Sequence, residues 1–190
     1  MTVFVAVTGA SGAIYADRAI RALAEKGVEV WGAITPTAAD IVRHELGSDP
    51  RELGGPAANA TWFACDDLSA PPASGSSCGD AMLVIPCSAG TLGRIAAGTA
   101  EGLVTRAADV CLKERRPLVL VTRETPLSLI HLRNMTMLTE AGAVILPACP
   151  HFYAGPRTID DLVDTVVGRA LAHLGVPNMD QPRWSPPADQ

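Results

Sequence analysis

Short apolar runs rich in β-branched residues alternate with longer amphipathic runs along almost the whole chain. Strands are predicted at residues 3–7, 28–35, 61–64, 82–86, 117–122 and 144–146. Helices are predicted at residues 14–23, 38–46, 92–97, 103–114, 127–141 and 159–174. Repeated strand–helix units form a parallel sheet whose right-handed crossovers place helices on both faces. We therefore predict an α/β fold with a three-layer, doubly wound (Rossmann-like), mostly parallel sheet.

The length and the spacing of these runs favour one domain. The chain has 190 residues, and 48% of them are hydrophobic, which is enough for one sizeable core. We expect a single Rossmann-like domain at residues 1–176 and a C-terminal arm at residues 177–190. The arm is rich in proline, and its Trp184 is expected to prefer a surface to bury against.

Composition excludes several classes of function. The formal charge of −5 speaks against nucleic acid as a partner, and no apolar run is long enough to span a membrane. The first residues enter a strand directly and do not read as a signal peptide. Five scattered cysteines without a CxxC motif indicate reduced thiols, a cytoplasmic location and no metal site.

The apolar run after Pro117 ends abruptly on Arg123 and Glu124, followed by a proline at position 126. This pattern is typical of a buried strand that is followed by a polar loop. In open α/β sheets, ligands bind in the crevice beyond the carboxyl ends of the strands. An adjacent cation and anion at that place suggest an anion to hold and a proton to move.

Two turns made of glycine and small hydroxyl residues follow predicted strands, at residues 8–13 and 86–92. Backbone N–H groups at such strand–helix turns can hold an anion, although neither turn matches GxGxxG. If their strands are adjacent, both turns face one crevice, which favours a phosphorylated cofactor. The alternative for the first turn is an ordinary strand–helix turn with Ser11 as the helix N-cap. Cys87 in the second turn could be a nucleophile, but a core thiol is favoured because no histidine lies nearby in the sequence and a buried strand precedes it.

Other polar residues have a structural and a functional interpretation. Thr35 either caps the helix that follows it or contacts a ligand, with the cap as the default. Glu45 lies near the end of that helix, where an acid opposes the helix dipole and so hints at another role. The low-complexity stretch at residues 69–77 reads as a flexible surface loop, or as a loop closing over a ligand or a neighbouring subunit.

Several cations lie in the second half of the chain. Arginine suits phosphate because its guanidinium binds two oxygens at once. The acid pairs Asp66-Asp67 and Asp160-Asp161 do not read as magnesium sites, so side chains are expected to neutralise any phosphate. The candidates are Arg106, Lys113, Arg123 and Arg169, with the hydroxyl of Tyr153.

These features occur in one order that resembles a known family, the UbiX-type flavin prenyltransferases. The matching segments are residues 8–13, 70–77, 86–92, 106–110, 112–120 with Arg123-Glu124, 131–135, 142–147 and 152–153. The resemblance implies transfer of a dimethylallyl group from dimethylallyl monophosphate to reduced FMN. Prenylated FMN with a fourth ring and phosphate would result, and a UbiD-type decarboxylase would receive the product. It also implies a doubly wound fold, a metal-independent enzyme and a homo-oligomer, in this family a dodecamer.

The resemblance also implies roles for individual residues. FMN would be held by Gly9, Ala10, Ser11, Thr35, Ser88, Ala89, Gly90, Thr91, Arg106 and Arg123. The prenyl phosphate would be held by Lys113, Arg123, Glu124, Tyr153 and Arg169, with Arg106 close by. The catalytic residues would be Ser11, Glu45, Glu124 and Lys113, of which Ser11 and the two glutamates would move protons around the flavin.

The chain departs from the family pattern at two positions, and two alternatives stay open. Thr35 stands where serine is usual, and Leu68 stands where some members have a tryptophan near the flavin. One alternative is an FMN-dependent oxidative cysteine decarboxylase, for which His44 is the nearby candidate histidine. The other is a non-catalytic flavin-binding subunit of a decarboxylase.

Overall fold

A six-stranded, all-parallel sheet forms the centre of the protein, in the strand order β3-β2-β1-β4-β5-β6. The computed structural model describes residues 1–176. The strands are β1 (Thr2–Val7), β2 (Glu29–Ile34), β3 (Thr61–Phe63), β4 (Ala81–Cys87), β5 (Leu118–Thr122) and β6 (Val144–Pro147). The helices are α1 (Ala13–Glu25), α2 (Pro36–Leu46), α3 (Ala89–Ala96), α4 (Leu103–Lys113), α5 (Leu129–Glu140) and α6 (Ile159–His173). The predicted doubly wound fold is confirmed, whereas the predicted arm and Trp184 lie outside the described residues.

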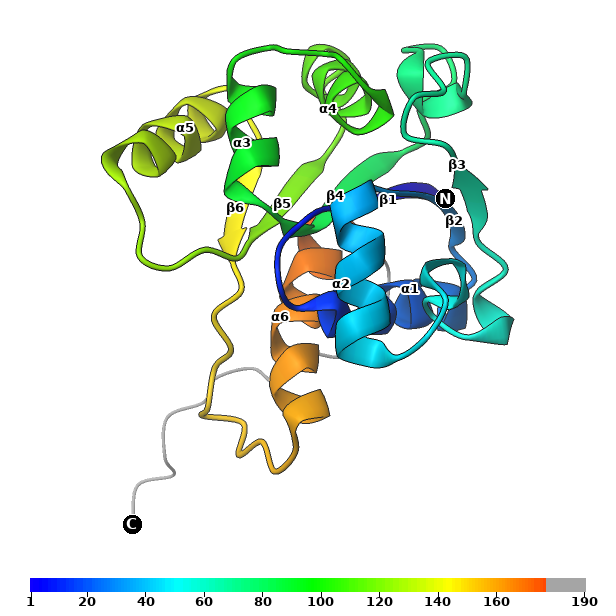
Figure 1. Ribbon diagram of the computed structural model, residues 1–190, viewed down its shortest axis with the longest axis vertical. Helices are drawn as coiled ribbons and strands as arrows, with labels where there is room; N and C mark the ends of the chain where they lie inside the picture. Colours follow the sequence, from blue (N-terminus) through cyan, green and yellow to red (C-terminus); the bar gives the residue numbers. More distant parts are fainter. Residues whose placement is uncertain (177–190) are drawn as a thin grey trace.

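Helices cover both faces of the sheet, so the fold has three layers (Figure 1). Helices α1, α2 and α6 pack on one face, over a core that includes Val5, Ile20 and Leu83. Helices α3, α4 and α5 pack on the other face, over a core that includes Phe4 and Leu120. Because β4 and β5 are covered from both sides, every residue of these two strands is buried, as their unbroken apolar runs predict.

The direction of winding reverses between β1 and β4. From β1 the chain builds β2 and β3 on one side of the sheet, and then crosses to build β4, β5 and β6 on the other. Ligands of open α/β sheets bind at such a switch point, beyond the carboxyl ends of the two strands. The turns at residues 8–13 and 86–92 follow β1 and β4, so the prediction that they face one crevice is confirmed.

The low-complexity stretch at residues 69–77 is packed against α4, which corrects its interpretation as a flexible surface loop. A short 3-10 helix, Pro71–Ala73, lies within it, and Ala70, Ala73 and the adjacent Cys78 are buried. The Ser77 hydroxyl donates a hydrogen bond to the Pro71 carbonyl at 3.0 Å. Within residues 1–176, no helix is long and apolar enough to cross a membrane.

Candidate functional site

Thr8 joins the two turns at the switch point. Its side chain is fully buried, and its hydroxyl donates to the Pro86 carbonyl at 2.8 Å. The same oxygen accepts a hydrogen bond from the Ser88 backbone N–H at 2.9 Å. A buried hydroxyl that is satisfied on both sides fixes the end of β1 to the end of β4, so the two turns form one rigid rim.

The first turn begins α1 in a way that the sequence interpretation of Ser11 as N-cap did not foresee. Gly12 is the N-cap, with a φ of 108° that favours glycine, and it offers no side chain to the helix. The Glu45 carboxylate, from the last turn of α2, accepts hydrogen bonds from the N–H groups of Gly12 at 2.9 Å and Ala13 at 2.8 Å. The interpretation of Ser11 as the N-cap is therefore wrong. Gly12 holds that position, and a carboxylate from a second helix accepts the capping hydrogen bonds.

Glu45 belongs to a small charged cluster at this turn. Partial burial raises the pKa of Glu45, but hydrogen bonds from the Ser11 hydroxyl, Ala13 and Gly12 and the charge of Arg123 outweigh it, so the pKa lies below its ordinary value. Arg123 in turn donates from Nε to the Ser11 carbonyl at 3.0 Å. The structure thus brings together three of the predicted site residues, and it keeps Glu45 ionised.

The second turn begins α3 with Ser88 as its N-cap. The Ser88 hydroxyl accepts from the Thr91 N–H at 3.2 Å and donates to the Thr91 hydroxyl at 3.0 Å. Arg94 donates from Nη2 to the same Thr91 hydroxyl at 3.2 Å. Arg94 was missed in the sequence, although its position one helical turn after Thr91 could have identified it. A helix N-terminus with two hydroxyls and a nearby guanidinium has the chemistry of an anion site.

Two neighbouring residues have the structural roles that were their default interpretations. Burial raises the pKa of the Cys87 thiol to about 12, so Cys87 is a core thiol and not a thiolate nucleophile. Thr35 is the N-cap of α2, and its hydroxyl accepts from the Ala38 N–H at 3.4 Å.

Glu124 follows Arg123 in the loop beyond β5, at the same edge of the sheet. The side chain is exposed, and its Oε1 accepts a hydrogen bond from the Thr125 N–H at 3.1 Å. An exposed carboxylate next to the charged cluster of Ser11, Glu45 and Arg123 can exchange a proton with a ligand in the crevice.

Tyr153 and Arg169 lie together in a groove between the edge strand β6 and helix α6. The groove has a volume of about 560 Å³, and Cys149 also lines it. The Tyr153 side chain is 53% exposed. The groove runs along the whole of β6 and continues beside the loop that leaves the carboxyl end of this strand.

The structure does not bring Lys113 to this rim within one chain. Lys113 is the last residue of α4, which returns to the amino edge of the sheet before β5 begins. Arg123 lies beyond the other end of β5, so the two residues are separated by the length of a five-residue strand, about 16 Å. The Lys113 ammonium is paired with Glu114, against Gly75 of the packed loop.

Arg106 also lies on α4 and is held by local contacts. Its Nε donates to the Ala73 carbonyl at 3.1 Å, and its Nη1 pairs with Asp109 at 2.8 Å. Arg106 and Lys113 therefore lie about two turns apart on α4, both beside the loop at residues 69–77, and each is paired with a nearby acid.

Comparison with known proteins identifies relatives over almost the whole chain. Residues 1–171 match the Flavoprotein family. The chain is 47% identical over 183 residues to a flavin prenyltransferase UbiX of Methanothermobacter thermautotrophicus, covering 96% of this chain and 95% of that protein. It is also 47% identical over 191 residues to a flavin prenyltransferase UbiX of Pseudomonas aeruginosa, covering 94% of this chain and 91% of that protein.

Solved structures agree with these relatives. AnUbiX (PadA1), solved in complex with FMN and dimethylallyl pyrophosphate, is 42% identical with a TM-score of 0.91, and the match covers 97% of each chain. A dodecameric FMN-dependent UbiX-like decarboxylase from Escherichia coli O157:H7 is 42% identical with a TM-score of 0.90, covering 98% of this chain and 100% of that one. The FMN-dependent cysteine decarboxylase TvaF is 21% identical with a TM-score of 0.66, which shows a shared fold alone.

Proposed function

Since this chain belongs to the UbiX-type flavin prenyltransferases, we propose that it transfers the dimethylallyl group of dimethylallyl monophosphate to reduced FMN. The carbon–oxygen bond to phosphate breaks, and the prenyl group bonds to a nitrogen of the flavin's central ring and then to a neighbouring carbon. Prenylated FMN with a fourth ring and inorganic phosphate are the products. The observation that carries this proposal is the rim that Thr8 makes from two turns, with Arg123 and Glu45 at its centre.

We place the FMN phosphate at the N-terminus of α3 rather than at that of α1. The Glu45 carboxylate already occupies the first N–H groups of α1, and a second anion there would be repelled. At α3, the hydroxyls of Ser88 and Thr91 and the guanidinium of Arg94 offer donors instead. The remaining proposed contacts to the flavin are Gly9, Ala10, Ser11, Thr35, Ala89, Gly90 and Arg123.

The prenyl phosphate is proposed to bind between Arg169, Tyr153 and Arg123. Fixed cations in a cleft stabilise the charge of the departing phosphate without having to reorganise. Glu124 is proposed to exchange a proton with that phosphate or with the flavin. Ser11 and Glu45 form a hydrogen-bonded pair that can relay a proton at the other side of the flavin.

We propose that Lys113, with Arg106 on the same helix, joins this site from another copy of the chain. Lys113 ends α4 at the amino edge of the sheet, the length of β5 away from Arg123, and Arg106 lies about two turns earlier on the same helix. We therefore propose a homo-oligomer, and a dodecamer as in the E. coli relative, in which one copy presents its α4 surface to the groove of a neighbour. Lys113 would then contact the prenyl phosphate, with Arg106 near the flavin.

A UbiD-type decarboxylase is the proposed recipient of the prenylated flavin. The five cysteines are all free thiols, which supports the proposed cytoplasmic location. The alternative of a cysteine decarboxylase gains no support from the site, because His44 is an exposed residue on the last turn of α2.

Release of inorganic phosphate tests the proposed reaction. Dimethylallyl monophosphate is incubated without oxygen with the protein and reduced FMN, and phosphate is measured over time. We expect release that requires both the protein and reduced FMN. Equal release with oxidised FMN would indicate a phosphatase and would contradict prenyl transfer.

A further inference from the structure

His151 stacks on Tyr153, a residue of the proposed prenyl phosphate site. The two ring centroids are 4.0 Å apart, and the ring planes differ by 8°. Phe152 between them is 70% exposed, and Tyr153 is 53% exposed, so this loop buries little of its aromatic surface. The imidazole of His151 is therefore a principal packing surface for the Tyr153 ring.

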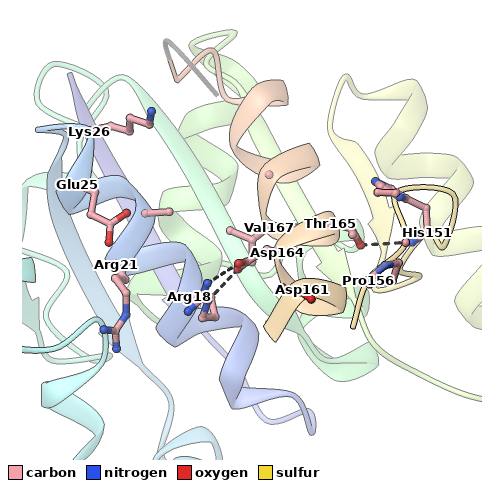
Figure 2. A pocket seen from close by; sticks show the side chains of 14 residues that line it. Arg18, Arg21, Glu25, Lys26, His151, Pro156, Asp161, Asp164, Thr165 and Val167 are labelled. Atoms are coloured by element: carbon pink, nitrogen blue, oxygen red, sulfur yellow. Dashed lines mark hydrogen bonds and ion pairs between the residues drawn. The ribbon is translucent and has the colours of Figure 1, made fainter. Parts of the chain in front are cut away.

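The backbone of His151 is fixed to α6. Its N–H donates to the hydroxyl of Thr165 at 3.3 Å (Figure 2). That hydroxyl donates in turn to the Leu162 carbonyl at 2.7 Å. Arg169 follows Thr165 by one turn on the same helix, and it lines the groove together with Tyr153. Helix α6 thus holds His151, which stacks on Tyr153, and it also carries Arg169, the cation that the groove offers to a phosphate.

Helix α6 is in turn fixed to α1. Arg18 donates from Nε to Asp164 at 2.8 Å (Figure 2). Its Nη1 lies 3.5 Å from Asp160. His151 lines the cavity of about 470 Å³ between these two helices, and it also lines the groove on the other side.

The hydrogen bonding of His151 indicates what its ring contributes. Among the described residues, His151 Nδ1 is a buried side-chain nitrogen with no hydrogen-bond partner. An unsatisfied buried polar atom does not stabilise a fold, so Nδ1 does not account for the place of this ring. Here the flat ring contacts Tyr153, and a flat apolar ring would make the same contact.

We propose that His151 is a positioning residue of the prenyl phosphate site, which holds the Tyr153 phenol over the groove by ring stacking. The inference rests on the proposed function, because Tyr153 and Arg169 are there assigned to the phosphate. In this role the imidazole neither contacts the substrate nor transfers a proton.

The test is a double-mutant cycle on substrate binding. Titration calorimetry measures the affinity of the FMN-loaded protein for dimethylallyl monophosphate, and steady-state assays measure KM and kcat. We expect His151→Ala to weaken binding about two- to tenfold, the range that ring stacking contributes, with a raised KM and little change in kcat. His151→Phe keeps a flat ring and is expected to restore most of the affinity.

The cycle separates positioning from a general structural role. In a Tyr153→Ala background, His151→Ala should cost no further affinity, and FMN affinity should match the wild type in all variants. Additive losses, or a His151→Phe as weak as His151→Ala, would overturn the proposal while leaving the proposed function intact. A wild-type protein that neither binds dimethylallyl monophosphate nor releases phosphate would instead overturn the proposed function, and this inference with it.

Discussion

The carboxylate of Glu45, at the end of α2, accepts the backbone N–H of Gly12 at 2.9 Å, at the start of α1. A side chain of α2 therefore accepts the hydrogen bonds that cap the N-terminus of α1, at the turn where the flavin is proposed to bind. This arrangement explains how a glutamate can lie near the C-terminus of its own helix, where the dipole disfavours it. The unfavourable interaction of the Glu45 carboxylate with the C-terminus of α2 is offset by its favourable interaction with the N-terminus of α1.

Glu45→Gln should lower the melting temperature at neutral pH by about 2–4 °C, as expected for a weakened helix cap. The folded pKa of Glu45 lies below its ordinary value, so its contribution to stability is present above that value and is lost as the pH falls through the folded pKa. Thermal unfolding of both proteins from about pH 7 to about pH 3 measures this. The difference should shrink in acid, and a difference that grows in acid would refute the ionised cap.

Ser88→Ala should weaken FMN binding about tenfold, because a hydroxyl contact to a charged phosphate is lost. Ser128 is a matched control, since it caps α5 in the same way: its hydroxyl accepts a hydrogen bond from the His131 N–H at 3.2 Å, as the Ser88 hydroxyl does from the Thr91 N–H. Both variants should lose about 1 kcal/mol of unfolding free energy. Fluorescence titration with FMN should distinguish them, and equal FMN affinity in both would place the phosphate elsewhere.

Lys113→Ala and Arg169→Ala should each lose most prenyl transfer while still binding FMN. If the two residues enter one site from different copies, co-expression of the two variants should restore about a quarter of the wild-type activity, by random pairing in a closed oligomer. Phosphate release by the purified mixed oligomer measures this. Activity no higher than the mean of the two variants would mean that no site combines the two copies.

Cys87 and Cys111 should resist alkylation by iodoacetamide in the native protein near pH 8. Burial raises the pKa of each thiol to about 12, whereas Cys149 is exposed. Peptide mass spectrometry before and after unfolding in guanidinium should find Cys149 modified first. Fast native modification of Cys87 would revive its interpretation as a nucleophile.

Apolar patterning made most of the fold predictable. The unbroken runs at residues 82–86 and 117–122 predict central parallel strands, and both became fully buried strands. The adjacency of the two turns was only a condition in the sequence argument, and the strand order of the sheet supplies it. Local periodicity is sufficient to infer the type of each element, but not the order of the strands.

Side-chain partners between distant segments were not predictable in the same way. Glu45 and Gly12 are 33 positions apart, and only the packing of α2 on α1 brings them together. Lys113 lies at the amino edge of the sheet because α4 ends there, before β5 begins. The family resemblance, in contrast, assigns Lys113 and Arg169 to the same phosphate site. The packing of the loop at residues 69–77 was likewise not predictable from its composition. A Cβ at Gly75 would lie 2.8 Å from Lys113 Nζ, so a small residue is needed where this loop contacts α4.

A mass spectrum of the flavin tests the central claim most directly. The wild type and Glu124→Gln are each incubated anaerobically with reduced FMN and dimethylallyl monophosphate, and the flavin is then released and weighed. We predict that the wild type adds one prenyl unit to FMN, and that Glu124→Gln binds FMN but adds little. Unmodified FMN from the wild type would contradict flavin prenylation, and full product from Glu124→Gln would remove that carboxylate from the mechanism.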